Sequence, residues 1–421
     1  MQALKGTHDI LPEEMYKWDY MEGIIRKICD TYGYKEIRTP IIEGTELFQR
    51  GIGDTTDVVT KEMYTFTDRG NRSVTLRPEN TASAVRAYLE HKMYGDQQVH
   101  KIFYIGSMFR YDRPQAGRYR EFHQFGLEVL GASSPLADAE VIAMAWEIFQ
   151  TFGLKDLKLH LNSIGDKNCR PAYREKLIQF FEGKKDQLCD DCRERLYKNP
   201  LRILDCKEEG CKHASEGAPV ITDYLCEGCQ KKLESLESYL DALGILYELD
   251  PSLVRGLDYY TNTAFEIQYT PLGAQSAVCG GGRYDGLVEE MGGPSTPGIG
   301  FAIGLERLLL ALEMQGLIPQ EKEKRRIYIA ALGDQAEVMG VKIQQALREK
   351  GYTADMDLQG RSLKGQMKQS GKLKSAFTVI IGNDEIESGQ AVVKNMAEGK
   401  QENVPFHQVV DYVIKGLNTD M

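Results

Sequence analysis

The 421-residue chain lacks the marks of a membrane or secreted protein. It has no apolar run long enough to cross a bilayer, and its first residues hold no basic segment followed by a hydrophobic one. Its hydrophobic fraction of 42% is ordinary for a globular protein that buries a sizeable core. We therefore expect a cytoplasmic chain of about three domains, with no membrane contact.

The chain also lacks an excess of positive charge, since its formal net charge is -10. Whole-chain charge averages over all faces, so a local basic stripe can still bind a nucleic-acid backbone. The segment 361–374, RSLKGQMKQSGKLK, contains no acidic residue and places Arg361, Lys364, Lys368 and Lys372 three or four residues apart. Judged alone, it fits RNA contact and a solvated helix face about equally well.

A cluster of arginines lies in the segment 103–131, FYIGSMFRYDRPQAGRYREFHQFGLEVLG. Strand-forming residues at 102–111 and 119–130 flank a turn that contains Pro and Gly. Such a hairpin would bring Arg110, Arg113, Arg118 and Arg120 to one mouth. Planar guanidinium groups that are always charged suit a polyphosphate. The alternative is a solvated basic hairpin.

Apolar periodicity divides the rest of the chain into a split core, an insertion and a tail. Met15, Trp18, Met21, Ile25 and Ile28 form one face of a helix that ends near Tyr32-Gly33, before a strand at 35–42. The core is then predicted to hold a helix at 135–152, strands at 158–164, 264–269 and 276–279, and a strand that runs into a helix at 298–307. Three glycines at 280–282 would let the backbone approach a ligand closely. After a charged linker at 321–326, the tail alternates strands at 327–332, 353–357, 376–382 and 390–395 with helices at 334–350 and 361–374.

The segment from 166 to about 243 is helical, charged and rich in cysteine, which indicates an inserted domain. Six of the nine cysteines form the pairs Cys189-x2-Cys192, Cys206-x4-Cys211 and Cys226-x2-Cys229. Two pairs of thiolates can supply all four ligands of a tetrahedral zinc ion. We predict structural zinc on Cys189, Cys192, Cys226 and Cys229, with reduced thiols as the alternative.

Several of these segments resemble the histidyl-tRNA synthetase family of class II aminoacyl-tRNA synthetases, in its bacterial type. The arginine hairpin resembles motif 2, the segment 13–43 motif 1, and GIGFAIGLERLLL at 298–310 motif 3. RGLDYYTNTAFE at 255–266 and GGRYDG at 281–286 are similar to the family's two signature peptides. The resemblance extends over nearly the whole chain.

The resemblance implies an α+β fold, in which helices flank an antiparallel sheet. It places the catalytic core at 1–165 and 244–320, the helical cysteine-rich insertion at 166–243, and a C-terminal α/β domain like an anticodon-binding domain at 326–421. In this family the motif 1 helix lies at a dimer interface, so a homodimer is expected. An intramolecular core helix would show the same apolar stripe.

The implied reaction joins L-histidine to ATP as histidyl-adenylate, releases pyrophosphate, and then transfers histidine to the 3′ end of its tRNA. By resemblance, Arg110 contacts the α-phosphate, Arg113 and Arg307 hold the rest of the triphosphate, and Asp112 lies in the same ATP site. Arg255 lies across the reacting carboxylate and the α-phosphate. Positioned cations, with Mg²⁺ on the phosphates, neutralise the charge that develops.

Binding residues follow from the same resemblance. Glu128 and Tyr260 match the positions that read the imidazole ring, and Glu79, Thr81 and Gln124 match those that accept from the α-amino group. The remaining matches are Arg255 and Tyr259 for histidine, and Gln115, Arg118, Arg361, Lys364 and Lys368 for tRNA. Two positions depart from the family's usual pattern: Asp112 replaces a glutamate, and Asn80 replaces a glycine.

Two other functions remain open from the sequence. A non-catalytic, histidine-binding regulatory subunit of histidine biosynthesis would keep the amino-acid pocket but lose the parts that bind tRNA and some that catalyse. An RNA-binding zinc module would explain the insertion and the tail, but it would leave the core arginines without a role.

Overall fold

The computed structural model describes residues 1–53, 56–96, 98–115, 117–321 and 325–419. The chain divides into two compact units, Met1–Pro319 and Gln320–Met421. Residues 322–324 of the predicted linker lie outside the described residues. No helix of the described part is both long enough and apolar enough to span a membrane.

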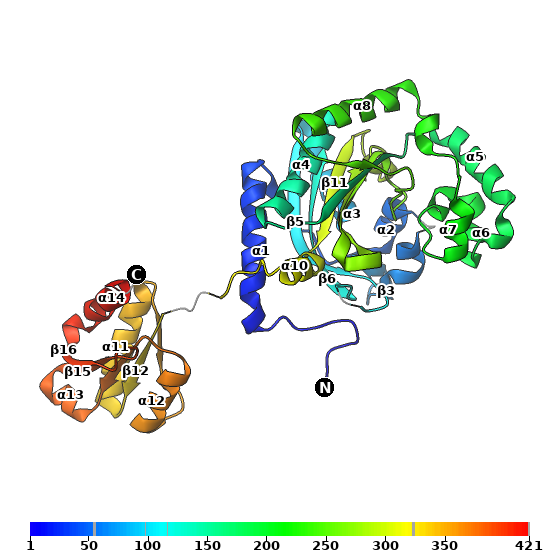
Figure 1. The fold of residues 1–421 in the computed structure, drawn as a ribbon. Helices are drawn as coiled ribbons and strands as arrows, with labels where there is room; N and C mark the ends of the chain where they lie inside the picture. Colours follow the sequence, from blue (N-terminus) through cyan, green and yellow to red (C-terminus); the bar gives the residue numbers. More distant parts are fainter. Residues whose placement is uncertain (54–55, 97, 116, 322–324, 420–421) are drawn as a thin grey trace. The chain divides into compact units, whose positions relative to one another are not determined.

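The first unit is built on an eight-stranded sheet with the order β1-β5-β6-β11-β10-β9-β7-β8 (Figure 1). The six inner strands run antiparallel, whereas β1 and β8 join the two edges as parallel strands. This arrangement confirms the predicted α+β class with a mainly antiparallel sheet. The strands are β1 (Lys35–Glu36), β5 (His100–Phe109), β6 (Glu121–Leu130), β7 (Leu157–Ser163), β8 (Glu248–Leu249), β9 (Thr261–Tyr269), β10 (Ala277–Arg283) and β11 (Gly298–Gly304).

The two faces of this sheet differ in chemistry because successive residues of a strand point to opposite sides. On β6, Phe125, Leu127 and Val129 enter a large apolar core, while Gln124 and Glu128 point to the other face. Four helices cover the apolar face and contribute to its core: α1 (Pro12–Thr31), α4 (Pro135–Thr151), α8 (Glu227–Ala242) and α10 (Leu305–Met314). The polar face is bordered by α2 (Thr45–Ile52), α3 (Thr81–Glu90) and α9 (Leu287–Glu290).

The apolar stripe of α1 is buried within its own chain. Trp18, Met21, Ile25 and Ile28 pack into the core beneath the sheet, whereas Met15 is 40% exposed. The apolar stripe of α1 is therefore explained by packing within one chain, which is the alternative to a dimer interface.

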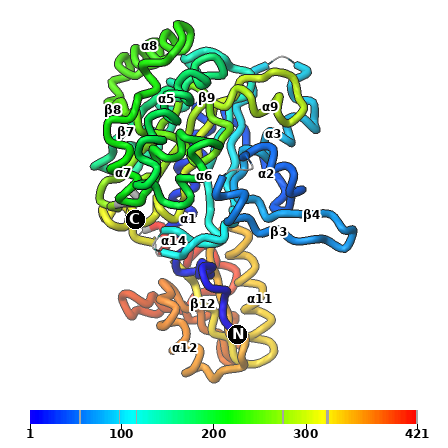
Figure 2. Tube along the Cα trace, turned by 90° about the vertical axis from the view of Figure 1, so that its right-hand side faces the viewer, coloured from blue at the N-terminus to red at the C-terminus, as the bar shows by residue number. Residues whose placement is uncertain are grey.

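The strand predicted at 35–42 is interrupted. It consists of β1 and of β2 (Ile42–Gly44), with Pro40 between them. Proline lacks the N–H that a continuous ladder needs. β2 joins β3 (Tyr64–Thr67) and β4 (Ser73–Leu76) in a small sheet of order β2-β4-β3, and the hairpin of β3 and β4 reaches outward from the unit (Figure 2). The sequence did not predict this sheet.

The inserted segment begins after β7 and contains α5 (Arg170–Glu182), α6 (Asp190–Lys198) and α7 (Glu209–Ser215). These helices enclose a core of their own, with Tyr173, Phe181, Cys192 and Cys211 buried in it. α8 then leads the chain back, because Leu233, Leu236 and Leu240 pack into the core of the large sheet.

A buried ion pair connects β10 to α4. Arg283 donates to both carboxylate oxygens of Asp138 at 2.9 and 2.8 Å, and the two side chains are 1% and 3% exposed. Arg283 also donates to the backbone oxygens of Ala132 and Ser134. The arginine of GGRYDG therefore has a structural role.

The second unit is an α/β domain around a five-stranded mixed sheet of order β13-β12-β14-β15-β16. β13 and β14 pair with β12 in parallel, while β15 and β16 add antiparallel. The sequence predicted the first four strands and the first two helices, and missed the last strand and the last two helices. These elements are β12 (Arg326–Ala331), α11 (Asp334–Glu349), β13 (Thr353–Met356), α12 (Leu363–Lys372), β14 (Phe377–Ile381), α13 (Asn383–Ser388), β15 (Gln390–Asn395), β16 (Gln401–Pro405) and α14 (Val409–Thr419).

Candidate active site and cysteine clusters

Glycines form the floor of the polar face of the large sheet. A Cβ on Gly280 would lie 2.0 Å from Arg255 Nη2, and a Cβ on Gly300 would lie 2.0 Å from Glu128 Oε2. Gly282 has a φ of +155° and stands beneath the ring of Tyr260. Because these positions have no side chain, the long side chains of Arg255, Tyr260 and Glu128 can lie directly on the sheet.

Glu128 is the centre of a buried polar pocket. Its Oε1 accepts from the hydroxyls of Thr81 at 2.8 Å and Tyr104 at 3.1 Å, and its Oε2 accepts from the hydroxyl of Tyr284. Burial raises the pKa of Glu128 to about 8, although hydrogen bonds from Tyr284 and Thr81 act in the opposite direction. A hydroxyl can donate or accept, so the pocket can satisfy either protonation state of this carboxyl group.

Glu79 caps the helix that borders the pocket. Its oxygens accept from the backbone N–H groups of Thr81 at 2.6 Å and Ala82 at 2.9 Å, at the N-terminus of α3. Burial raises the pKa of Glu79, while these hydrogen bonds act against the shift. Glu79 and Glu128 also interact electrostatically, so a cationic ligand would be favoured between them.

Two polar atoms of this face have no partner among the described residues. Gln124 Oε1 is a buried acceptor, and Arg255 Nε is a buried donor. Unpaired buried polar atoms cost free energy, and in native structures they mark places where a ligand or water completes the bonding. The pair therefore offers a bound molecule one acceptor and one donor.

Arg255 is anchored by an acidic residue of β9. Its Nη1 donates to Glu266 Oε2 at 2.7 Å, and its guanidinium lies 5.9 Å from the ring centre of Tyr260. The rings of Tyr259 and Tyr260 are 4.7 Å apart. Burial raises the pKa of Tyr259, and the neighbouring Tyr260, Glu79 and Glu128 add to the shift. The predicted histidine-site residues Glu79, Thr81, Glu128, Arg255, Tyr259 and Tyr260 thus meet on one face.

A group of arginines lies beside this pocket. Arg307 donates to the backbone oxygens of Ala277 at 2.8 Å and Gly117 at 3.3 Å. Burial lowers the pKa of Arg307, and the positive charges of Arg118 and Arg110 lower it further. Crowded, partly buried guanidinium groups favour an anionic ligand between them.

The arginines of the hairpin also have partners within the protein. Arg110 donates from Nε to the Pro78 backbone oxygen at 2.8 Å, and Arg118 forms an ion pair with Asp112. Arg120 stacks on the ring of Tyr111 with its guanidinium carbon 3.8 Å from the ring centre. Arg120 Nε also donates to the backbone oxygen of Asp112 at 3.3 Å, so Arg118 and Arg120 both contact this residue at the mouth of the hairpin.

The other residues predicted in this loop are accessible. Arg113 is exposed, and its backbone N–H donates to Asp112 Oδ1 at 2.7 Å. Gln115 is exposed as well and exchanges backbone hydrogen bonds with Arg118 across the turn. The structure leaves both side chains available to a ligand from solution.

In the second unit, the predicted basic segment lies on α12. Lys364 and Lys368 are exposed, while Arg361 donates to Asp357 Oδ1 at 2.6 Å. Gln366, on the opposite side of the helix, is buried against Ala331. The exposed lysines thus form the outer face of an amphipathic helix, and the charge of Arg361 is partly neutralised.

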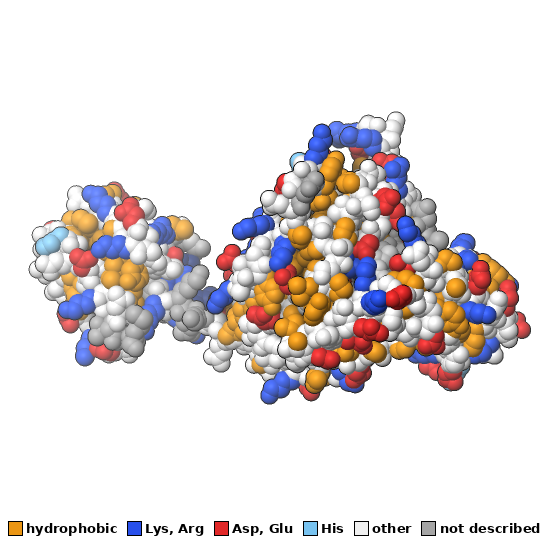
Figure 3. Space-filling view, turned by 90° about the horizontal axis from the view of Figure 1, so that it is seen from above, with side chains coloured by type: hydrophobic (Ala, Val, Ile, Leu, Met, Phe, Trp, Pro, Cys, Tyr) orange, Lys and Arg blue, Asp and Glu red, His pale blue; other side chains and the backbone are white. Residues whose placement is uncertain are grey.

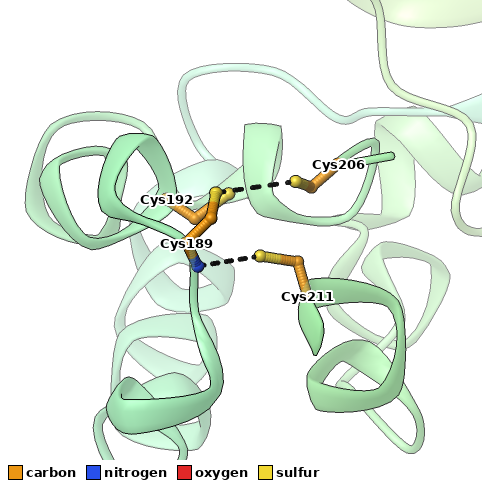
Figure 4. Close-up of side chains that lie close together, drawn as sticks. All are labelled: Cys189, Cys192, Cys206 and Cys211. Carbon is orange, nitrogen blue, oxygen red and sulfur yellow. Dashed lines mark hydrogen bonds between the residues drawn. The ribbon is translucent and has the colours of Figure 1, made fainter. Parts of the chain in front are cut away.

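The cysteines predicted as one zinc site belong to two clusters. Cys189 and Cys192 lie with Cys206 and Cys211 (Figure 4), whereas Cys226 and Cys229 lie with Asp166 and Cys169. In each cluster, the four candidate ligand atoms are all within 4.8 Å of one another. The prediction that paired Cys189 and Cys192 with Cys226 and Cys229 is corrected, because the fold separates the two helix starts that hold them. All nine cysteines are free thiols.

Sequence reasoning did not assign three residues that shape the pocket: Tyr104, Tyr284 and Glu266. Tyr104 crosses over Gly126, where a Cβ would lie 2.4 Å from the tyrosine hydroxyl, and reaches Glu128 from a neighbouring strand. Tyr284 and Glu266 are within the segments 281–286 and 255–266 singled out from the sequence. The glycine that faces each of the two tyrosines is the signal that could have identified Tyr104 and Tyr284.

Known proteins resemble the chain over nearly its whole length. Residues 6–308 match the family described as histidyl-tRNA synthetase, and residues 326–416 match the anticodon binding domain family. The chain is 53% identical to the histidine–tRNA ligase of Halothermothrix orenii, over 99% of both chains. It is 54% identical to that of Desulforamulus reducens, over 97% of this chain and 98% of the relative. The crystal structure of apo Staphylococcus aureus histidyl-tRNA synthetase superposes with a TM-score of 0.81 at 46% identity, over 98% of this chain and 99% of the other. The chain therefore belongs to the histidyl-tRNA synthetase family.

Proposed function

We propose that this chain performs the reaction of its family, the ATP-dependent joining of L-histidine to the 3′ end of histidine tRNA. The observation that supports this most directly is the position of the Glu128 pocket beside the arginine group on one glycine floor. The Glu128 pocket would bind the amino acid, and the adjacent arginine group would bind the polyphosphate. The two substrates of an adenylation reaction need this adjacency, since their reacting atoms must meet.

The pocket suits histidine. The Glu128 carboxylate accepts the ring N–H, and the hydroxyl of Tyr260 serves the other ring nitrogen. Gln124 Oε1 and Thr81 accept from the α-amino group, and the negative charge of Glu79 favours that cation. A receptor that pairs each donor and acceptor of its ligand rejects analogues lacking them by about four orders of magnitude.

In the first step, the histidine carboxylate attacks the α-phosphate and pyrophosphate leaves. Arg255 lies across the carboxylate and the α-phosphate, held in place by Glu266. Arg110 contacts the α-phosphate, while Arg307 and the exposed Arg113 hold the remainder of the triphosphate. ATP enters as its Mg²⁺ complex, and the cation reduces the charge repulsion between the phosphates.

The second step requires tRNA at the same site. Gln115 and Arg118 of the hairpin turn contact the acceptor end, and Arg118 exchanges its ion pair with Asp112 for a phosphate. Lys364 and Lys368 of α12, together with Arg361, contact the anticodon arm. On the face of the molecule shown in Figure 3, acidic and basic side chains are intermixed. Local groups such as these lysines, and not the overall charge, would position the RNA.

Two measurements test this proposal. Histidine-dependent ATP–pyrophosphate exchange is expected for the chain, and it should fall at least about a hundredfold in Arg255→Ala because a charge-stabilising donor is lost. Arg38→Ala removes an arginine that is 79% exposed and should leave exchange unchanged. Charging of histidine tRNA is expected as well. Histidine binding without exchange would instead identify a regulatory subunit, and exchange without charging would refute the second step.

We also propose a homodimer, as the family resemblance implies. The buried stripe of α1 no longer supports this, so a second copy must use other apolar residues. Met15, Ile41 and Ile42 are 40%, 43% and 50% exposed and remain available. Light scattering should give twice the mass of the chain, and Ile42→Glu should reduce it. A monomer at micromolar concentration would refute the proposal.

The cluster of Cys189, Cys192, Cys206 and Cys211 is proposed to hold a structural zinc ion. It joins the start of α6 to α7, which holds Cys211, and to Cys206 in the segment before α7, inside the small core formed by α5, α6 and α7. Four thiolates suit tetrahedral zinc, and the backbone N–H of Cys189 already donates to Cys211 Sγ at 3.2 Å. Such a site stabilises the insertion and takes no part in the chemistry.

A further inference from the structure

We propose that Asp166, Cys169, Cys226 and Cys229 form a second zinc site, which joins both ends of the insertion to the start of β9. The site is separate from the four-cysteine cluster and from the substrate pocket. It binds a divalent ion through three thiolates and one carboxylate oxygen. Its position makes it a clamp on the segment that carries Tyr259 and Tyr260.

The ligand atoms are gathered from both ends of the insertion. Asp166 and Cys169 stand between β7 and α5, where the insertion begins, and Cys226 and Cys229 stand at the start of α8, where it ends. Their four candidate ligand atoms all lie within 4.8 Å of one another. A tetrahedral ion with Zn–S distances of about 2.3 Å separates its ligands by less than this, so a small contraction would complete the site.

The two cysteine clusters repeat one local design. Cys226 is the N-cap of α8 and Cys229 lies in its first turn, as Cys189 and Cys192 do in α6. In this geometry two thiolates approach one ion from a single helix start, whose dipole favours negative charge. A second chain segment supplies the other two ligands in both clusters.

The surroundings already orient the ligands of the proposed site. The Cys226 N–H donates to Cys169 Sγ at 3.1 Å, and Asp166 Oδ1 accepts from the Asn168 N–H at 2.8 Å. Hydrogen bonds of this kind hold metal ligands in place in known sites. Arg170 interacts electrostatically with Asp166 and Cys169 and would offset part of the negative charge of four anionic ligands.

Asn262 connects the site to the segment that carries Tyr259 and Tyr260. Cys229 Sγ lies 3.1 Å from Asn262 Oδ1, and the backbone of Asn262 exchanges hydrogen bonds with Ile164 at 2.7 Å and Gly165 at 2.8 Å. Asn262 has a φ of +49°, an uncommon conformation that needs support from its surroundings. Arg170, at the start of α5, donates to the backbone oxygen of Tyr260.

Fixing Cys229 and Asp166 therefore fixes the backbone next to Tyr260. When the Cys229 thiol becomes a thiolate, it accepts a hydrogen bond, so the amide of Asn262 turns its NH₂ group toward the sulfur. The ion thus stabilises the Tyr259–Asn262 segment through its contact with Asn262.

Metal counting on the full chain tests the site. Protein purified under reducing conditions from zinc-supplemented medium should contain two zinc ions per chain by plasma mass spectrometry. Cys226→Ser and Cys211→Ser should each remove one ion, from different clusters, and the double variant should contain none. Cys29→Ala is the matched control, since Cys29 is a fully buried thiol outside both clusters, and it should keep both ions. One zinc in the wild type that survives Cys226→Ser would overturn the proposal, as would none in either protein.

X-ray absorption identifies the ligands without relying on a destabilised variant. The Cys211→Ser protein should show about three sulfur ligands at 2.3 Å and one oxygen at 2.0 to 2.2 Å per zinc. Asp166→Cys in that background should raise the sulfur count to four and keep the ion. A sulfur count that Asp166→Cys does not change would exclude Asp166 as a ligand.

Hydrogen exchange tests the clamp. Loss of the ion in Cys226→Ser should speed exchange of the Asn262 amide at least about tenfold, whereas Cys211→Ser should not. Equal protection in both variants would overturn the clamp. A weaker histidine affinity in Cys226→Ser is also expected and rests on the proposed function. Neither the metal count nor the exchange rate depends on the reaction, so failure of the clamp can be distinguished from failure of the proposed function.

Discussion

Glu128 allows a quantitative prediction because its protonation is linked to histidine binding. In the free protein burial raises the pKa of Glu128 to about 8, so the carboxyl group is about nine-tenths protonated at pH 7. Bound histidine places a ring N–H and a cationic amino group nearby, and both favour the carboxylate. Binding should therefore release about 0.9 proton at pH 7. A reaction that releases a proton is favoured as the pH rises.

The magnitude follows from the fraction of ionised Glu128. This fraction rises from about 0.09 at pH 7 to about 0.5 at pH 8, so histidine affinity should increase about fivefold, or about 1 kcal/mol, and then level off. Isothermal titration calorimetry in two buffers with different ionisation enthalpies measures both the affinity and the proton release.

The matched variant is Glu128→Gln, which keeps the shape of the side chain. It cannot ionise, so the contribution of Glu128 to the pH dependence between 7 and 8 should vanish. Affinity should also fall by about 1.5 to 3 kcal/mol, because a hydrogen bond to a charged group is lost and an NH₂ group now faces hydroxyls of the pocket. Equal affinity at pH 7 and pH 8 in the wild type, or an unchanged pH dependence in the variant, would refute the assignment of Glu128 as the ring receptor.

Four further substitutions test other parts of the structure. Gly300→Ala puts a Cβ 2.0 Å from Glu128 Oε2, so it should raise the KM for histidine in pyrophosphate exchange at least about tenfold. Gly304→Ala is the control, because a Cβ there has no atom within 4 Å and should leave the KM unchanged. Equal effects of the two substitutions would contradict the role of the glycine floor. Arg283→Ala leaves a buried carboxylate unpaired and should lower the free energy of unfolding by about 3 to 5 kcal/mol in urea titrations. A loss below about 1 kcal/mol would show that the pair is dispensable. Lys364→Ala and Lys368→Ala should weaken tRNA binding, and each should reduce the number of salt ions released on binding by about one. Pyrophosphate exchange should stay constant in both variants. An unchanged dependence of tRNA affinity on salt would exclude α12 from the RNA interface.

Local patterns predicted most elements of the first unit. The strands expected at 102–111 and 119–130 are β5 and β6, and the helix expected at 135–152 is α4. A strand buries every second residue and a helix buries residues with a period of 3.6, and each pattern can be recognised within a single segment of the sequence. The prediction was wrong at 35–42, where hydrogen bonding across strands is required and Pro40 interrupts it.

The polar site shows the same boundary between local and tertiary information. Motif resemblance named Glu79, Thr81, Glu128, Arg255 and Tyr260, and the structure brings them to one face. Motif resemblance could not name the partner residues that hold these side chains in place. Tyr104 and Glu128 meet because β5 and β6 are in register, and Glu266 reaches Arg255 only through the pairing of β9 with β10.

The cysteines separate what the sequence determined by itself from what only the tertiary structure decided. The sequence determined that thiolates would occur in pairs two residues apart, because that spacing is a property of one helix start. The tertiary structure decided which pairs meet. Cys226 and Cys229 lie beside Asp166 and Cys169 because the chain leaves the large sheet after β7 and α8 brings it back to the core of the same sheet. Proximity between segments some sixty residues apart depends on the packing of the whole sheet. The spacing of residues within one segment cannot predict that packing.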